Sequence, residues 1–227
     1  MFEKVGLLDR EAHRAYRLKV PGERYGFAAA AHAAPLMAGE FAEAGRFYPI
    51  FFARDAEGAL VPVVLLGLRQ GRNLFVDGGA WAAGHYVPAH FRRYPLILAD
   101  EDAIAIDAAY ESPEDGVPLF GPDGANTPAL DELIGLVVTF RQEAERTRAF
   151  CDRLGELGLL KDVNLQVATA DGRNHSFTDL LMVDAARLDT LEDARLVELF
   201  RSGEMAWILV HLWSTGAVAG LAARDGA

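Results

Sequence analysis

The sequence has a single cysteine, Cys151, in 227 residues, which excludes a disulfide within the chain. Cys151 lies in the run RTRAFCDRLGEL, which predicts an ordinary helical position, with a reactive thiol as the alternative. A chain of this length buries about 70% of the surface that its unfolded form exposes, so its core needs no disulfide or structural metal.

A secretory leader is also missing from the N-terminal run MFEKVGLLDREAHRAYRLKV, which mixes both charges with apolar residues and has no continuous apolar stretch. Together with the single cysteine, this run predicts a cytoplasmic protein, with export by another route left open.

Basic charge is scarce: 22 Lys and Arg stand against 33 Asp and Glu, which gives a net charge of −11. A surface that binds nucleic acid needs a basic patch or stripe, so we expect no nucleic-acid partner. Hydrophobic residues make up 51% of the chain, too many for an intrinsically disordered protein.

Catalytic and metal-binding motifs are missing as well. The sequence contains no HExxH, GxSxG, GxxxxGK[ST] or GxGxxG motif, and no histidine is followed two residues later by Asp or Glu. We therefore predict no cofactor, no metal and no catalytic residue. An enzyme of unknown chemistry, acting on a peptide or beside an oxidative enzyme, remains the alternative.

The longest segment without a charged residue runs from Met205 to Ala223. Its 19 residues approach the length of a membrane-spanning helix, but they include His211, Ser214, Thr215 and two glycines. The segment predicts a buried strand or buried helix, a Ser-Thr-Gly turn and a short terminal helix, with a C-terminal membrane anchor as the alternative.

Strand patterns dominate the first half of the chain. A short helix over 35–47 precedes three predicted strands in a meander, and DAEG forms a hairpin loop between the first two. The pattern continues after them. The five predicted strands are 48–54, 60–68, 73–77, 91–100 and 103–109.

Helical patterns dominate the second half. The longest predicted helix covers 128–159, with Thr127 as its N-cap. A hairpin of 163–169 and 177–184 follows, and then a helix over 189–203 that ends at Gly203. This order predicts an α+β fold: an antiparallel β meander and a second hairpin, packed with one long and several short helices. We expect a single domain over 1–227, with a subdivision open at the Pro/Gly-rich loop 111–128.

The stretch WAAGHYVPAHFRRYPLIL, residues 81–98, concentrates the residue types that dominate binding hot spots. On a strand, the adjacent Arg92 and Arg93 would point to opposite faces. One would turn inward against a carboxylate, and the other would clamp a carboxylate of a ligand. The predicted binding residues are Trp81, Tyr86, Arg92, Arg93 and Tyr94, supported by Asp77, Glu40, His85 and His90. The alternative is that this stretch only locks a loop.

Two blocks of the sequence resemble the SapC-like family of bacterial proteins. The first contains Tyr48-Pro49, NLFVD at 73–77, Trp81 and the pattern Y-x-P-x-x-x-RRYP from Tyr86 to Pro95. The second, MVDAARLDTLEDARLVELFRSGEMAWILVHLWS, is an acidic helix that leads through a glycine to an apolar HL-x-S segment.

The resemblance implies an association with bacterial surface-layer genes, and similarity to proteins encoded near outer-membrane transporters and oxidative enzymes. It carries over no catalytic residue. We therefore predict a binding or accessory protein that recognises a protein, a peptide, or a surface-layer or outer-membrane component. We expect a protein or peptide partner and no membrane partner, and a homodimer is left open.

Overall fold

The computed structural model describes residues 2, 4–19, 24–99 and 103–226. The chain folds into two compact units, each built from three separate stretches. Unit 1 contains 1–29, 75–83 and 89–142, and unit 2 contains 30–74, 84–88 and 143–227. The loop 111–128 lies wholly within unit 1. The predicted α+β class is confirmed, because both units combine helices with antiparallel strands.

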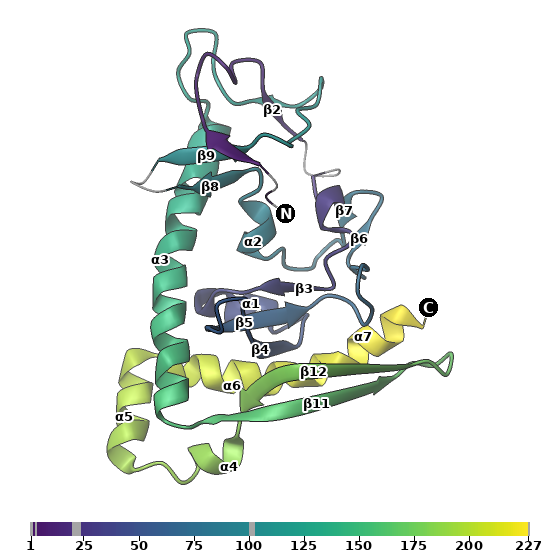
Figure 1. The fold of residues 1–227 in the computed structure, drawn as a ribbon, viewed down its shortest axis with the longest axis vertical. Helices are drawn as coiled ribbons and strands as arrows, with labels where there is room; N and C mark the ends of the chain where they lie inside the picture. The colour runs from purple at the N-terminus through teal and green to yellow at the C-terminus, as the bar shows by residue number, and fades with distance from the viewer. Residues whose placement is uncertain (1, 3, 20–23, 100–102, 227) are drawn as a thin grey trace. The chain divides into compact units, whose positions relative to one another are not determined.

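Unit 1 contains three small antiparallel sheets (Figure 1). The first has the order β1–β9–β8, and the pairs β2–β10 and β6–β7 form the others. These strands, with the 3-10 helix η2 and the one-turn helix α2, are β1 Val5–Leu7, β2 Arg17–Leu18, η2 Gly26–Ala28, β6 Val76–Asp77, β7 Ala80–Trp81, α2 Ala89–Arg92, β8 Leu96–Leu98, β9 Ile104–Asp107 and β10 Val117–Pro118.

One apolar cluster holds unit 1 together. It joins β2, β8 and β9 to the loop after β10 and to the first half of the helix α3, Pro128–Glu156. Leu133 and Val137 are buried in this cluster at helical spacing, as the sequence predicts. The other buried members are Leu18, Leu96, Ile106, Leu119, Phe120 and Leu130.

Unit 2 contains a five-stranded antiparallel sheet with the order β11–β12–β4–β5–β3. The predicted hairpins form its two halves: DAEG joins β4 to β5, and a turn at Asp171-Gly172 joins β11 to β12. Short helices precede and follow these strands. The elements up to α5 are β3 Ala33–Pro35, η3 Ala38–Glu40, α1 Phe41–Ala44, β4 Ile50–Arg54, β5 Leu60–Leu65, β11 Leu160–Ala168, β12 Asn174–Val183, α4 Ala185–Leu188 and α5 Asp193–Ser202.

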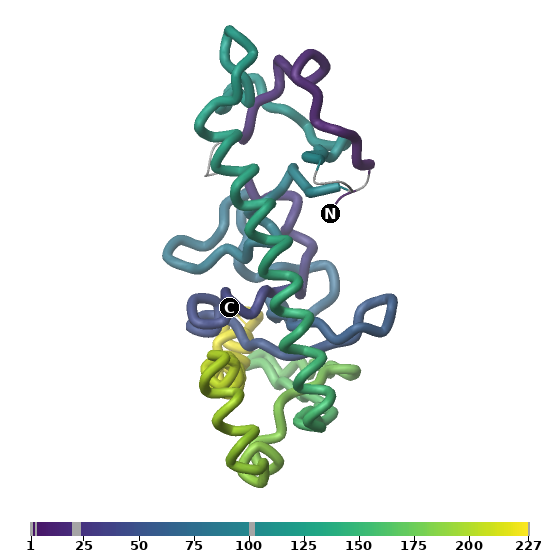
Figure 2. Tube along the Cα trace, turned by 90° about the vertical axis from the view of Figure 1, so that its left-hand side faces the viewer, coloured from purple at the N-terminus to yellow at the C-terminus, as the bar shows by residue number. Residues whose placement is uncertain are grey.

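Aromatic rings fill the core of unit 2. Phe150, from the second half of α3, contacts Phe41 and Phe52, with ring centroids 6.3 and 6.2 Å apart. Trp207 and His211 contact Phe150 and Phe52. These two residues belong to α6, Glu204–Ser214, which continues through η5, Thr215–Ala217, into α7, Val218–Asp225. Figure 2 shows α3 as one continuous helix along the chain.

Two predictions of local structure are wrong. The run 73–77 does not extend the meander, because it forms only β6, whose partner β7 follows through the Gly78-Gly79 turn. Both glycines have positive φ, 54° and 84°, as a two-residue hairpin requires. The expected strand over 91–100 starts only at Leu96, because Phe91 and Arg92 belong to α2; Asp100 lies outside the described residues. For 205–223 the sequence left a strand or a helix open, and the structure shows the helix.

The helix predicted over 189–203 starts four residues late, at Asp193, because residues 185–188 form the separate turn α4, capped by the Asp184 side chain. It ends as predicted at Gly203, whose φ of 83° suits glycine. The helical segment Glu204–Asp225 is long and apolar enough to cross a membrane. Core helices of soluble proteins meet the same criterion of length and composition.

Candidate functional site

Arg92 and Tyr94 lie at one end of α2 in unit 1. Pro88 precedes this helix and Pro95 follows it, which limits it to a single turn. The backbone N–H groups of Arg93 and Tyr94 donate to the carbonyls of Ala89 and Phe91, at 3.1 Å each. The Arg92–Tyr94 backbone is therefore held by hydrogen bonds to the helix that precedes it.

Arg24 binds this turn from another part of unit 1. Its Nη2 donates to the carbonyl oxygen of Arg92 at 2.7 Å and approaches that of Tyr94 at 3.5 Å. Both contacts use the same nitrogen, so among the described residues the Nε and Nη1 groups of Arg24 stay available. A guanidinium has five N–H donors in a fixed plane, a geometry that matches a carboxylate.

Two cavities meet at Arg24, and we call them the Arg24 cavities. Lys19 and Arg24 line both. The larger cavity has a volume of about 400 Å³, and its other lining residues are Leu18, Tyr25, Arg92, Val117, Ala129, Glu132, Leu133 and Leu136. The smaller has a volume of about 240 Å³, and its other lining residues are Gly26, Phe27, Tyr94, Ala109, Tyr110 and Glu111.

The larger cavity combines cationic and apolar surface. Lys19, Arg24 and Arg92 contribute three positive charges, and Glu132 contributes one negative charge. Leucine and valine side chains from β2, β10 and α3 supply apolar walls. A pocket of a few hundred Å³ with apolar walls and a few convergent polar groups is the usual form of a ligand site. This cavity therefore suits a ligand that joins an acidic group to an apolar one.

Aromatic rings form one wall of the smaller cavity. The rings of Tyr94 and Phe27 lie 4.2 Å apart, and those of Tyr94 and Tyr110 lie 5.7 Å apart. The Tyr110 hydroxyl donates to the carbonyl of Arg17 and accepts from the N–H of Lys19, at 3.0 Å each. Burial raises the pKa of Tyr110, so its hydroxyl stays neutral at physiological pH. These contacts fix Tyr110 against the backbone of Arg17 and Lys19, and the Tyr94 ring packs against Tyr110.

Arg93 is directed away from the cavities, into an aromatic environment. Its guanidinium carbon lies 4.3 Å from the centre of the Phe140 ring and 4.9 Å from that of Phe2. Burial lowers the pKa of Arg93 to about 10. Its buried Nε has no hydrogen-bond partner among the described residues. Stacking on two rings thus accounts for the position of Arg93, and Arg92 is the arginine that lines a cavity.

Trp81, which we expected to anchor a ligand, is packed inside unit 1. Its exposed fraction is 9%, and its ring contacts those of Tyr25 and Phe91 at 5.8 and 5.4 Å. Asp77 is exposed on β6 and, among the described residues, pairs with neither Arg92 nor Arg93. Asp77 therefore does not hold either arginine in place.

Three of the other predicted residues belong to unit 2. The Tyr86 hydroxyl donates to Oε1 of Glu40 at 2.7 Å, and the Tyr86 carbonyl accepts from the Tyr48 hydroxyl at 2.5 Å. Glu40 also accepts from the N–H of Met37. His85 packs on the Phe47 ring and lies 2.9 Å from an Arg224 nitrogen. A pairing of Glu40 with Arg92 or Arg93 stays a prediction.

His90 belongs to unit 1, beside the ring of Phe91. Burial and the nearby charge of Arg93 lower its pKa to about 4, so it is neutral at physiological pH. His90 lines neither Arg24 cavity. Among the residues that the structure describes, no three His, Cys, Asp or Glu side chains converge as metal ligands.

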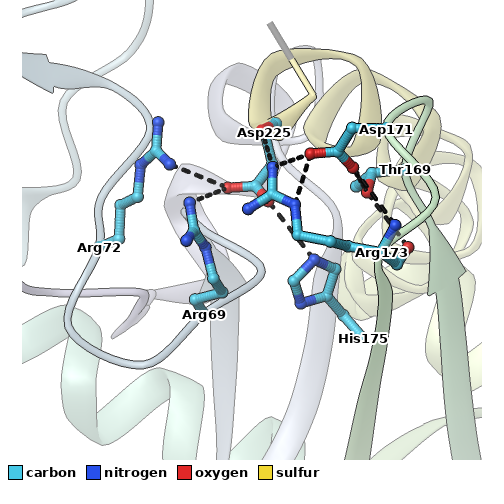
Figure 3. A network of polar contacts seen from close by, with 7 residues as sticks. All are labelled: Arg69, Arg72, Thr169, Asp171, Arg173, His175 and Asp225. Carbon is cyan, nitrogen blue, oxygen red and sulfur yellow. Dashed lines mark hydrogen bonds and ion pairs between the residues drawn. The ribbon is translucent and has the colours of Figure 1, made fainter.

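A second polar cluster lies in unit 2 around Asp225, whose side chain is fully buried (Figure 3). Its Oδ1 lies 3.2 Å from Arg69 and 3.4 Å from Arg72, and its Oδ2 lies 3.4 Å from both Arg173 and His175. We call these five residues the Asp225 cluster. Its members come from α7, β12, the β11–β12 turn and the chain that follows β5, so the cluster ties the end of α7 to the rest of unit 2.

Of the residues that line the Arg24 cavities, the sequence analysis named Arg92 and Tyr94 as candidates and did not name Arg24, Lys19 or Tyr110. Arg24 stands in the run PGERYGF, 68 residues before Arg92. Only the tertiary structure brings it to α2, so no local signal could have identified it. The same is true of Asp225 and its three arginines.

The model of the SapC family matches residues 8–221. No curated protein and no solved structure matches the chain. The family match covers both Arg92 and Tyr94 in the RRYP run and most of the Asp225 cluster. The chain belongs to the SapC family.

Proposed function

We propose that this chain is a non-catalytic binding protein that recognises an acidic group of a peptide or protein through the Arg24 cavities. The observation that carries the proposal is the convergence of Lys19, Arg24 and Arg92 on one cavity in a protein with a net charge of −11. The net negative charge of the whole protein repels an anionic ligand, so it does not account for binding of an anion. A local cluster of cations in such a chain is therefore best explained by a local anionic ligand.

The rigidity of the cavity wall supports the same proposal. Hydrogen bonds fix the backbone of Arg92 and Tyr94, and ring contacts fix the Tyr94 side chain. A site that is ordered before binding loses less conformational entropy when its ligand arrives. The apolar walls beside Arg24 would receive an aliphatic or aromatic side chain next to the acidic group. An acidic peptide with an apolar neighbour has this chemistry.

Among the described residues, the Arg24 cavities do not support the alternative of an enzyme. A pocket that holds His85 or His90 with two carboxylates would favour it, and the described linings of the two Arg24 cavities contain no histidine. We propose a surface-layer or outer-membrane component as the partner because of the family resemblance.

Binding of fluorescent peptides, followed by anisotropy, tests this function. The peptides pair Asp or Glu with Leu or Phe, and a matched set replaces the acids with Asn and Gln. Loss of one hydrogen bond between charged groups costs about 1.5–3 kcal/mol. We therefore expect Arg24→Ala and Arg92→Ala to weaken binding of the acidic peptides by about 10- to 100-fold each.

Arg10→Ala is the matched control, because Arg10 is exposed in unit 1 and lines neither cavity. It removes the same charge and should change the affinity less than about twofold. Equal weakening by all three variants would show a general charge effect and contradict the site. Equal binding of the acidic and amide peptides would contradict acidic recognition.

A further inference from the structure

The segment from α6 to α7 has its polar side chains turned toward the protein. His211 is fully buried: its Nδ1 donates to the carbonyl of Ile50 and its Nε2 accepts from the N–H of Val183, at 3.0 Å each. Ser214 accepts from the N–H of Ile50. Asp225 is buried in its cluster. The polar groups of this segment therefore face the sheet of unit 2.

The opposite face of the same segment is open and apolar. Leu209 is 55% exposed and Trp213 is 70% exposed. From Ala206 to Ala223 no Lys, Arg, Asp or Glu occurs. The exposed positions recur every three or four residues and form a strip about 26 Å long. We call this strip the outer face; its residues are Ala206, Leu209, Trp213, Gly216, Ala219, Gly220 and Ala223.

This arrangement reverses the pattern of a helix on the surface of a monomer. Such a helix turns its apolar stripe to the core and its charged residues to water. Here the outward positions from Ala206 to Ala223 are apolar or small, and the exposed Arg224 marks the C-terminal end of the strip. Only 22% of the residues in the most apolar part of the segment are buried. An exposed apolar strip without charge marks a contact surface.

We propose that two copies of this chain form a dimer in which their outer faces pack antiparallel. The large residues of the strip, Leu209 and Trp213, lie in its first half. The small ones, Gly216, Ala219, Gly220 and Ala223, lie in its second half. An interface with two-fold symmetry must be complementary to itself.

A two-fold axis beside Gly216 satisfies that condition. It sets Leu209 of one copy against Ala223 of the other, and Trp213 against Ala219 and Gly220. Every large side chain thus meets a small one, and glycine and alanine allow the two helices to approach closely. A Cβ atom built on Gly216 or Gly220 meets no atom within 4 Å, so the space above both glycines is open in the single chain.

The order of large and small residues along the strip favours a second copy over a lipid bilayer, because a bilayer requires no such complementarity. Helices that lie on membranes usually carry Lys and Arg beside their apolar face. The net charge of −11 opposes an anionic bilayer and a second copy alike, so net charge does not select between them. A strip about 26 Å long and one helix diameter wide buries on the order of 1,000 Å² over two copies, the lower limit of a specific interface. We therefore expect a dimer of moderate affinity.

Analytical ultracentrifugation of the full chain from about 1 to about 100 μM tests the dimer, since this range suits an interface near the lower limit of size. We expect a monomer–dimer equilibrium in the wild type. Trp213→Lys should raise the dissociation constant at least about thirtyfold, because it places a charge in the centre of the interface. Circular dichroism should show unchanged folding, because Trp213 is exposed. A monomer throughout this range, or a dimer that Trp213→Lys leaves intact, would overturn the proposal.

Gly220→Trp distinguishes a second copy of the chain from a lipid bilayer as the partner of the outer face. In the dimer, the new ring clashes with Trp213 of the other copy, so dimerisation should fail. The double variant Trp213→Ala/Gly220→Trp restores one large residue opposite one small residue, and we expect it to recover the dimer. Sedimentation with phosphatidylcholine–phosphatidylglycerol vesicles completes the test. Vesicle binding that Gly220→Trp strengthens would make the strip a lipid-binding face and refute the dimer, as would failure of the double variant.

Discussion

Replacement of Asp225 by Asn should destabilise unit 2 by an amount that the exposure of its partners determines. Asp225 is fully buried, but the side chains of Arg69, Arg72 and Arg173 are 41, 49 and 38% exposed. Removal of one partner from a fully buried ion pair costs about 3–5 kcal/mol, whereas an exposed pair contributes about 0–1 kcal/mol. The arginines keep part of their hydration when the carboxylate is lost. We therefore expect the free energy of unfolding to fall by about 2–3 kcal/mol.

Differential scanning calorimetry measures this loss. In a chain of 150–250 residues, 1 kcal/mol shifts Tm by about 2–4 °C, so Asp225→Asn should lower Tm by roughly 4–12 °C. Glu43→Gln is the matched control: it also removes one carboxylate, but Glu43 pairs with Arg46 where both side chains are 61% exposed. We expect it to shift Tm by less than about 2 °C. Equal shifts for the two variants would refute the assignment of a stabilising role to the Asp225 cluster.

Three further predictions follow from buried groups and from one turn. Burial lowers the pKa of His211 from 6.5 to about 4. The contribution of His211 to the free energy of unfolding should therefore be complete above pH 6.5 and fall by up to about 3 kcal/mol as the pH drops toward 4. Measurement of Tm against pH checks this, and His211→Gln should reduce the fall of Tm between pH 6.5 and 4. Burial raises the pKa of Cys151 to about 12, so the native thiol should resist a maleimide that labels the denatured chain at once; rapid native labelling would contradict this. Gly203 has a φ of 83°, so Gly203→Ala should lower the free energy of unfolding, measured in urea, by about 1 kcal/mol. Gly155 lies in α3, and a Cβ atom there meets no atom within 4 Å, so Gly155→Ala should not destabilise the protein.

Elements with a strong local pattern could be predicted from the sequence. The helix α3 has an N-cap residue at Thr127, a buried stripe through Leu133 and Val137, and glycines at its end, so its position was clear. The β4–β5 and β11–β12 hairpins have alternating apolar residues and glycine turns. In each case the sequence within about 30 residues determines the element.

Elements that depend on distant partners could not be predicted in this way. The apolar run Met205 to Trp213 suits a strand or a helix, and the ring contacts of Trp207 and His211 belong to the helix observed. Arg92 and Arg93 suggested a strand with two faces, but Pro88 and Pro95 confine this stretch to a turn of helix. The candidate site was found only in part, because Arg24 and Lys19 reach it from another segment of the chain.

The interleaved construction of the two units restricts how this protein can be divided or made. The chain passes from one unit to the other five times, at 29/30, 74/75, 83/84, 88/89 and 142/143. No contiguous fragment holds all of one unit without part of the other, because 1–142 contains unit 1 together with 30–74 and 84–88 of unit 2, and 30–227 contains unit 2 together with 75–83 and 89–142 of unit 1. Truncation at one point therefore cannot isolate either unit as a minimal binding module. Because synthesis starts at the N-terminus, unit 1 is complete only after residue 142 has been made. Until then its strands cannot pack against the first half of α3. Such long-range closure slows folding and makes fragments prone to aggregate.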